Sequence, residues 1–141
     1  MCAHARSHMR VVILNPSPYV TACTRTRTRT QKDYGGFPEE SYEYTYGAAG
    51  SPNVADQVLA ALAAEGVEHG TKNTDRGWDH GVFVPLMLAF PKAEVPVVQL
   101  SLVSGLDPLL HLKMGKALGR LRTKNILILG SGMCKLRFSL S

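Results

Sequence analysis

The chain alternates between continuous apolar runs and segments in which apolar residues recur at about every fourth position. Continuous runs at 11–14, 95–102 and 125–129 predict β-strands, with Gln99 as the main polar interruption of the second run. The first run ends at Asn15-Pro16-Ser17-Pro18, a sequence typical of a turn. The density of the two later runs is typical of strands in a sheet that is covered on both faces.

Helices are predicted between these strands. Ser51-Pro52 and Asp107-Pro108 each combine a favoured N-cap residue with a proline in the first turn, and Gly66 ends the first helix. Residues 82–90 are almost entirely apolar and predict a buried helix, with Pro85 in its first turn. The inward stripes of the other two helices are Val54, Val58 and Leu62, and Leu110, Met114, Leu118 and Leu121.

Strands that alternate with helices predict an α/β domain with a largely parallel or mixed sheet and flanking helices. We expect this domain to occupy residues 32–141, and residues 1–31 to be an irregular N-terminal segment. Ligands in such domains bind beyond the carboxyl ends of the strands. His80 and the turn Gly130-Ser131-Gly132 therefore mark the predicted position of a site.

The composition fits a single globular domain. The chain has 141 residues, of which 45% are hydrophobic and 19% charged. No apolar run approaches the roughly 18 residues that span a bilayer, and the N-terminus has no apolar core of a secretory signal. The three cysteines, Cys2, Cys23 and Cys134, are widely spaced and fit a reducing compartment. We therefore expect a cytoplasmic protein without a membrane partner.

The net charge of +5 has two sources. One is the run Arg25, Arg27 and Arg29, and the other is the outward face of the helix after Asp107-Pro108. Both could attract an anionic substrate or a nucleic acid, or could simply be solvated surface. No aromatic residues or known nucleic-acid fold signature accompany the arginine run, so we expect no nucleic-acid partner.

Candidate chemistry is concentrated in Gly77-Trp78-Asp79-His80-Gly81, at the start of the predicted apolar helix. A histidine at the mouth of a cavity can transfer protons, an adjacent acid can fix its tautomer, and a glycine allows close approach to a ligand. Upstream, Tyr34-Gly35-Gly36-Phe37-Pro38 predicts a loop. Tyr42, Tyr44 and Tyr46 then recur at period two, which predicts an extended segment with its rings on one side, either at a core edge or as a ligand platform.

Several segments occur in an order that resembles one enzyme family. They are Asp33-Tyr34-Gly35-Gly36-Phe37-Pro38, Tyr46 to Gly50 with Ser51-Pro52, Gly77-Trp78-Asp79-His80-Gly81, Val95 to Ser101, His111 with Met114 to Leu118, and Gly130 to Met133. Over roughly residues 32–133 the chain resembles the class III extradiol ring-cleavage dioxygenases, in the branch of the DOPA 4,5-extradiol dioxygenases.

The resemblance implies a non-haem Fe(II) enzyme, some relatives of which are described with Zn(II). Its substrates would be a catechol-type aromatic ring and O₂, both atoms of which enter the cleaved ring. His80 matches the family's acid–base histidine, a role that suits imidazole because it titrates near neutrality. His111 matches a second family histidine and is a candidate for substrate binding; its alternative interpretation is a helix-start residue bonded to nearby backbone.

The resemblance also implies metal ligands from regions that this chain largely lacks. His8 is the nearest candidate for one ligand, and Cys134 lies near the position of another, either as a soft ligand or as a buried cysteine. We therefore expect a domain that is incomplete relative to the family fold, truncated at both ends. The alternative function is a non-catalytic, truncated paralogue that acts as a binding or interaction protein.

Overall fold

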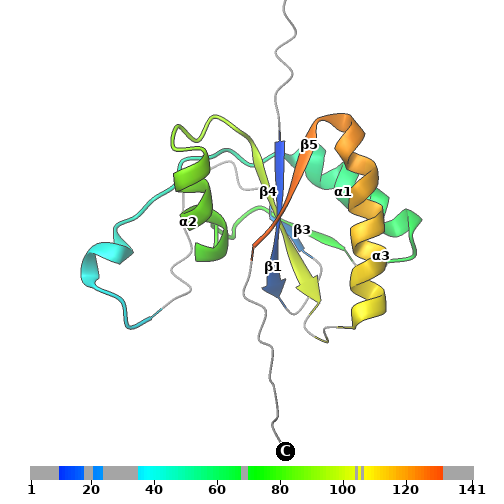
Figure 1. The fold of residues 1–141 in the computed structure, drawn as a ribbon, viewed down its shortest axis with the longest axis horizontal. Coiled ribbons are helices and arrows are strands. Elements are labelled where there is room, and N and C mark those ends of the chain that lie inside the picture. Colours follow the sequence, from blue (N-terminus) through cyan, green and yellow to red (C-terminus); the bar gives the residue numbers. More distant parts are fainter. Residues whose placement is uncertain are drawn as a thin grey trace, which may run out of the picture.

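The computed structural model describes residues 10–17, 21–23, 35–67, 70–103, 105 and 107–131. Their centre is a sheet of five strands in the order β3-β2-β4-β1-β5 (Figure 1). The strands are β1 (Arg10–Ser17), β2 (Thr21–Cys23), β3 (Thr71–Asn73), β4 (Val97–Val103) and β5 (Ile126–Gly130). β1 is parallel to β4 and β5, and β2 is parallel to β3 but antiparallel to β4. The predicted α/β class with a mixed sheet is confirmed.

Helices cover both faces of this sheet. Figure 1 shows α2 (His80–Ala89) on one face, and α1 (Pro52–Ala64) and α3 (Pro108–Gly119) on the other. Two short 3₁₀ helices, η1 (Glu39–Tyr42) and η2 (Arg120–Lys124), complete the described elements. The arrangement is therefore a three-layer α/β/α domain.

Alternate residues of the central strand β4 contribute to the two hydrophobic cores, one on each face of the sheet. Val98 and Leu100 belong to the core under α1 and α3, whereas Val97 belongs to the core under α2. Because successive side chains of a strand point to opposite faces, Gln99 and Ser101 share the α2 face with Val97. Both polar residues are buried there, at 3% exposure. The α2 face thus carries the buried polar groups of the central strand.

The predicted helix ends are confirmed. The Ser51 hydroxyl accepts a hydrogen bond from the N–H of Val54 at 3.4 Å, and the Asp107 carboxylate accepts one from the N–H of Leu109 at 3.0 Å. Gly66 follows α1 with φ of +72°, a conformation that glycine adopts without the penalty a Cβ would bring. The N–H groups of Gly66 and Val67 return to carbonyls of the last helical turn.

Several predictions about single elements need correction. β1 lies inside the sheet between β4 and β5, so residues 1–31 are not simply an irregular segment outside the domain. Residues 71–73, for which the sequence predicted no strand, form β3 because they pair with β2. α2 is buried on one side only, since Val84 and Leu88 are exposed.

The sequence predicted that β5 lies in a sheet covered on both faces. The structure places β5 at the edge of the described sheet, and its Leu127 is 37% exposed. The tyrosines also differ from their prediction, because Tyr46 is buried while Tyr44 is 52% exposed. No helix in the described ranges has both the length and the apolar character needed to traverse a bilayer. The arginine run at 25–29 and Cys134 lie outside the described residues.

Candidate functional site

A short, internally bonded loop connects β3 to α2 and delivers His80. The side-chain oxygen of Asn73, the last residue of β3, accepts hydrogen bonds from the N–H groups of Asp75 and Arg76 at 2.9 and 2.8 Å. Asparagine favours this local bonding because its short side chain reaches the backbone two and three residues ahead. The turn therefore fixes the backbone position of Arg76, from which the chain returns toward the sheet.

Trp78 anchors the same loop in the core under α2. Its side chain is fully buried, and the indole N–H donates to the carbonyl oxygen of Ala48 at 3.2 Å. Tyr46 belongs to the same cluster and donates its hydroxyl to the carbonyl of Phe90 at 3.0 Å. Burial raises the pKa of the Tyr46 hydroxyl, because a phenolate would lose solvation there. These contacts tie the segment before α1 to both ends of α2.

Asp79 is the N-cap residue of α2 and is 2% exposed. Its carboxylate accepts from Arg76 Nη2 at 2.9 Å and from Gln99 Nε2 at 2.5 Å. The N–H of Asp79 in turn donates to Gln99 Oε1 at 3.1 Å. Buried carboxylates require partners of this kind, because an unpaired charge in the interior is costly. The side chains of Arg76 and Gln99 thus hold the residue next to His80 through three hydrogen bonds.

The start of α2 lies beside the carboxyl end of β5. The Ser131 hydroxyl, directly after β5, donates a hydrogen bond to the carbonyl oxygen of Gly81. The sequence predicted that His80 and the turn at 130–132 would mark the site, and the structure brings Ser131 and the His80 region together. Gly132 lies outside the described residues.

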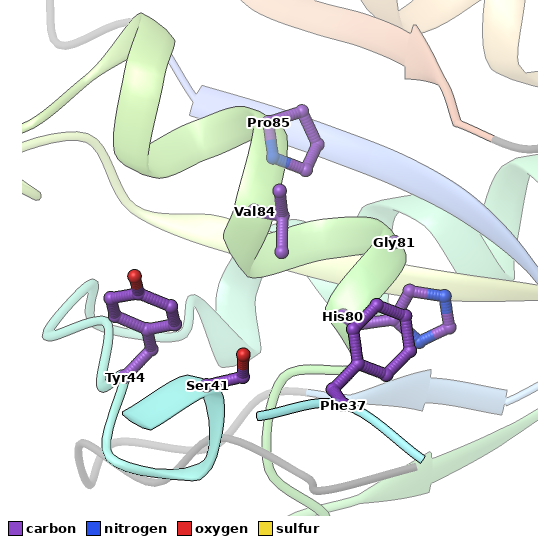
Figure 2. Close-up of a pocket in the computed structure, with 7 residues that line it drawn as sticks. All are labelled: Phe37, Ser41, Tyr44, His80, Gly81, Val84 and Pro85. Carbon is purple, nitrogen blue, oxygen red and sulfur yellow. The ribbon is translucent and has the colours of Figure 1, made fainter. Parts of the chain in front are cut away.

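His80 opens onto a pocket between α2 and the segment around η1. Its volume is about 460 Å³, and it is lined by Phe37, Ser41, Tyr44, His80, Gly81, Val84 and Pro85. Figure 2 shows His80 and Phe37 at one end, Tyr44 at the other, and Val84 on α2 between them. His80 is exposed, in contrast to buried Asp79 before it. The pocket has the apolar walls and few polar groups that are typical of small-molecule sites.

The structure does not bring His111 into this pocket. His111 lies in the first turn of α3, on the opposite face of the sheet from α2 (Figure 1). Its Nδ1 is 2.7 Å from the carbonyl oxygen of Asp107, and its Nε2 accepts from the N–H of Val103 at 3.2 Å. Both ring nitrogens therefore contact backbone groups that fix the connection from β4 to α3. His8 lies outside the described residues.

A metal ion in such a site needs about three protein ligands. Within the described ranges, no three His, Cys, Asp or Glu side chains form a group that could hold one. Asp79, the buried acid nearest His80 in the chain, already uses its carboxylate on Arg76 and Gln99. The described residues do not, by themselves, fit a metal centre.

Several residues of this arrangement were not predicted as functional. In the sequence, Gln99 stands out only because it interrupts an apolar run. Its position two residues after Val97 places it on the same face of the strand as Val97. Arg76 and Asn73 carried no recognisable signal, since both belong to a polar stretch of the sequence. Val84 was predicted as core, and only the helix rotation places it on the pocket side.

A second cluster of charges lies far from the pocket, between α1 and α3. Glu65 pairs with Lys116 at 3.0 Å and with Arg120. The hydrogen bond from Lys116 and the nearby positive charges lower the pKa of Glu65. This cluster joins the C-terminal ends of two helices and is structural.

Comparisons with known proteins agree with this fold and identify the family. A solved structure of an uncharacterized protein from Escherichia coli K12 is similar with a TM-score of 0.68 and 25% identity, covering 89% of this chain and 47% of that one. Among curated proteins, the dioxygenase tasH of Hapsidospora irregularis is 51% identical over 100 residues, 71% of this chain and 31% of its own. The 4,5-DOPA dioxygenase extradiol of Beta vulgaris is 45% identical over 100 residues, 37% of its length.

The chain thus spans about a third of the length of these curated relatives. Residues 5–139 match the family described as the catalytic LigB subunit of aromatic ring-opening dioxygenase. The expected resemblance to class III extradiol dioxygenases is confirmed, and the match covers nearly the whole sequence. The chain belongs to the LigB family of aromatic ring-opening dioxygenases.

Proposed function

We propose that this chain forms the ring-binding pocket and supplies the acid–base histidine of an extradiol dioxygenase. Its substrates are a catechol-type aromatic compound and O₂, and its metal is non-haem Fe(II) or Zn(II). The observation that carries the proposal is the position of His80, exposed at the start of α2 and lining an aromatic pocket. Membership of a dioxygenase family gives this pocket its expected chemistry.

The pocket walls suit a flat aromatic ring. Phe37 and Tyr44 approach from the segment around η1, while Val84 and Pro85 come from α2 on the other side (Figure 2). Aromatic and aliphatic surfaces of this kind hold a ring by apolar contact and by offset or edge-to-face packing. The ring hydroxyls then belong at the His80 end, since that end has the imidazole.

His80 acts as the proton carrier in this proposal. An imidazole nitrogen accepts a proton from a ring hydroxyl and later returns it to the oxygenated product. Asp79 and Gln99 are positioning residues, because their mutual hydrogen bonds hold the first residue of α2 against β4. The described residues do not make a metal centre by themselves, so what they supply is the pocket and the proton transfer at His80.

The experiment is oxygen uptake by the purified chain with a catechol and added Fe(II), followed by the visible absorbance of a yellow ring-opened product. We expect His80→Ala to lower the rate by about 10²- to 10⁴-fold, the usual contribution of a positioned acid–base group. Leu88→Ala is the matched control, because Leu88 is on the same helix, 83% exposed, and does not line the pocket.

Two results would contradict the proposal, the first for the acid–base role of His80 and the second for dioxygenase activity. One is product formation by His80→Ala at the rate of the unchanged chain. The other is folded protein that binds catechols but consumes no O₂ with Fe(II) present. The second result would favour the alternative, a non-catalytic binding protein that keeps the aromatic pocket.

A further inference from the structure

We infer that the pocket beside His80 selects catechols whose ring substituent is uncharged and apolar over catechols that carry a carboxylate. The inference rests on the proposed function, because it takes the catechol ring as the group bound next to His80. It goes further by assigning the remainder of the pocket to the substituent. Three features of the described residues support it: the exposed apolar walls, the nature of the polar lining and the charge of η1.

The walls present large apolar side chains to solvent. Phe37 is 58% exposed, Tyr44 52% and Val84 47%, and all three line this one pocket. Exposed apolar surface that gathers in a concave site is typical of ligand binding rather than of ordinary surface. An apolar substituent would remove this surface from water, which is the main driving force for its binding.

The polar lining contains no formal countercharge for a carboxylate. Among the described lining residues the polar side chains are those of Ser41, Tyr44 and His80, and none is Lys or Arg. The His80 end is taken by the ring hydroxyls in the proposed function. A carboxylate placed further along the pocket would lose its hydration without gaining an ion pair, which is unfavourable.

The neighbouring 3₁₀ helix carries negative charge that would repel an anionic ligand. η1 has Glu39 and Glu40 in its first turn, and Glu43 follows at its C-cap; all three are exposed. Ser41 of the same helix lines the pocket, so the segment that forms one side of the pocket carries these three acids. Like charges at a rim lower the local concentration of an anionic ligand and slow its association.

The layout of the pocket assigns a place to the substituent. In Figure 2, Val84 on α2 lies between His80 at one end and Tyr44 at the other. A ring whose hydroxyls meet His80 therefore directs a substituent along Val84 toward Tyr44. Val84 is thus the residue through which the charge of the pocket can be changed without touching His80.

The test compares the affinities of 4-tert-butylcatechol and 3,4-dihydroxyphenylacetate for the full chain, by anaerobic titration calorimetry. Both probes carry the same diol, so their affinity ratio reports the substituent alone. We expect the alkylcatechol to bind at least tenfold more tightly. Equal affinities, tighter binding of the carboxylate, or no binding of either probe would overturn the inference.

Variants of α2 sharpen this comparison. Val84→Lys supplies a cation inside the pocket and should reduce the ratio at least tenfold, whereas Leu88→Lys adds the same charge outside the pocket and should leave the ratio unchanged. Val84→Thr keeps nearly the same shape and should weaken alkylcatechol binding without helping the carboxylate. An unchanged ratio in both Val84 variants, with their circular dichroism intact, would overturn the inference.

Oxygen uptake separates this inference from the proposed function. Turnover in which the carboxylate probe binds more tightly would overturn the selectivity and leave the dioxygenase proposal standing. Tighter binding of the alkylcatechol without oxygen uptake would support the selectivity and contradict the dioxygenase proposal.

Discussion

Gln99 and Asp79 exchange two hydrogen bonds across the buried face of the sheet. The Gln99 amide nitrogen donates to the Asp79 carboxylate at 2.5 Å, and its amide oxygen accepts from the Asp79 N–H at 3.1 Å. One side chain of the central strand therefore bonds both the backbone and the side chain of the N-cap residue of α2. The start of that helix, and with it His80, is fixed relative to β4.

Gln99→Leu should lower the free energy of unfolding by about 2–3 kcal/mol, because it leaves two buried polar groups of Asp79 without this partner. Urea denaturation of the two proteins measures the difference. The matched control is Gln57→Leu on α1, whose amide donates to Asn53 at 2.7 Å in an exposed pair. That change should cost within about 0.5 kcal/mol. Equal effects of the two substitutions would contradict the role given to Gln99.

Removal of His111 should affect stability more than removal of His80. His111→Ala should reduce stability by about 1–2 kcal/mol, because the N–H of Val103 and the carbonyl of Asp107 each lose a partner. His80→Ala should change stability by less than about 1 kcal/mol, because His80 is exposed. Thermal unfolding of both variants, beside their catechol oxidation rates, checks this pattern. A larger loss of stability for His80→Ala would contradict it.

The ion pairs of Glu65 predict that the fold loses stability in acid. Its pKa is lowered in the folded state, chiefly by the hydrogen bond from Lys116, so its contribution to stability is present above the unfolded pKa of about 4.5. That contribution is lost as the pH falls through the folded pKa. Glu65→Gln should therefore be less stable than the unchanged chain at pH 6, and the gap should narrow as the pH falls below 4.5.

Melting temperatures measured from pH 6 downward provide the readout for Glu65. Glu94→Gln removes an exposed carboxylate from the turn before β4 and serves as the control. A gap for Glu65→Gln that stays constant over this pH range would show that the ion pairs with α3 do not stabilise the fold.

Two glycines should respond to alanine with opposite signs. Gly66→Ala should destabilise by about 1 kcal/mol, because its φ of +72° is strained for a residue with a Cβ. Gly115 lies within α3, and a Cβ there meets no atom within 4 Å, so Gly115→Ala should stabilise by about 0.5–1 kcal/mol. Denaturant midpoints decide both, and a stabilising Gly66→Ala would contradict the structure.

The elements built from local signals were predicted well. α1 and α3 begin where Ser51 and Asp107 indicated, because N-capping depends only on residues within one turn. β4 followed from its apolar run, and the two segments singled out for a site, His80 and the turn after β5, lie close together through the Ser131 hydrogen bond to Gly81. These predictions depend on interactions between residues that are close together in the sequence.

The elements that depend on distant partners were not predictable in the same way. β3 consists of three polar residues, Thr71 to Asn73, and is a strand because β2 pairs with it. The exposure of Val84 depends on how α2 rotates over the sheet, which a uniformly apolar segment does not indicate. The aromatic pocket combines residues some forty positions apart, and only tertiary packing brings Phe37 to His80.

The alternation along β4 has a consequence for how this protein can change over time. Val98 and Leu100 supply hydrocarbon to one layer, while Gln99 supplies the polar anchor of α2 to the other. A single inserted or deleted residue in this strand would exchange the two sets of side chains. The anchor would then point into the hydrocarbon under α1 and α3, so stability and pocket geometry would be lost in the same event. This strand should therefore tolerate point substitutions more readily than insertions or deletions.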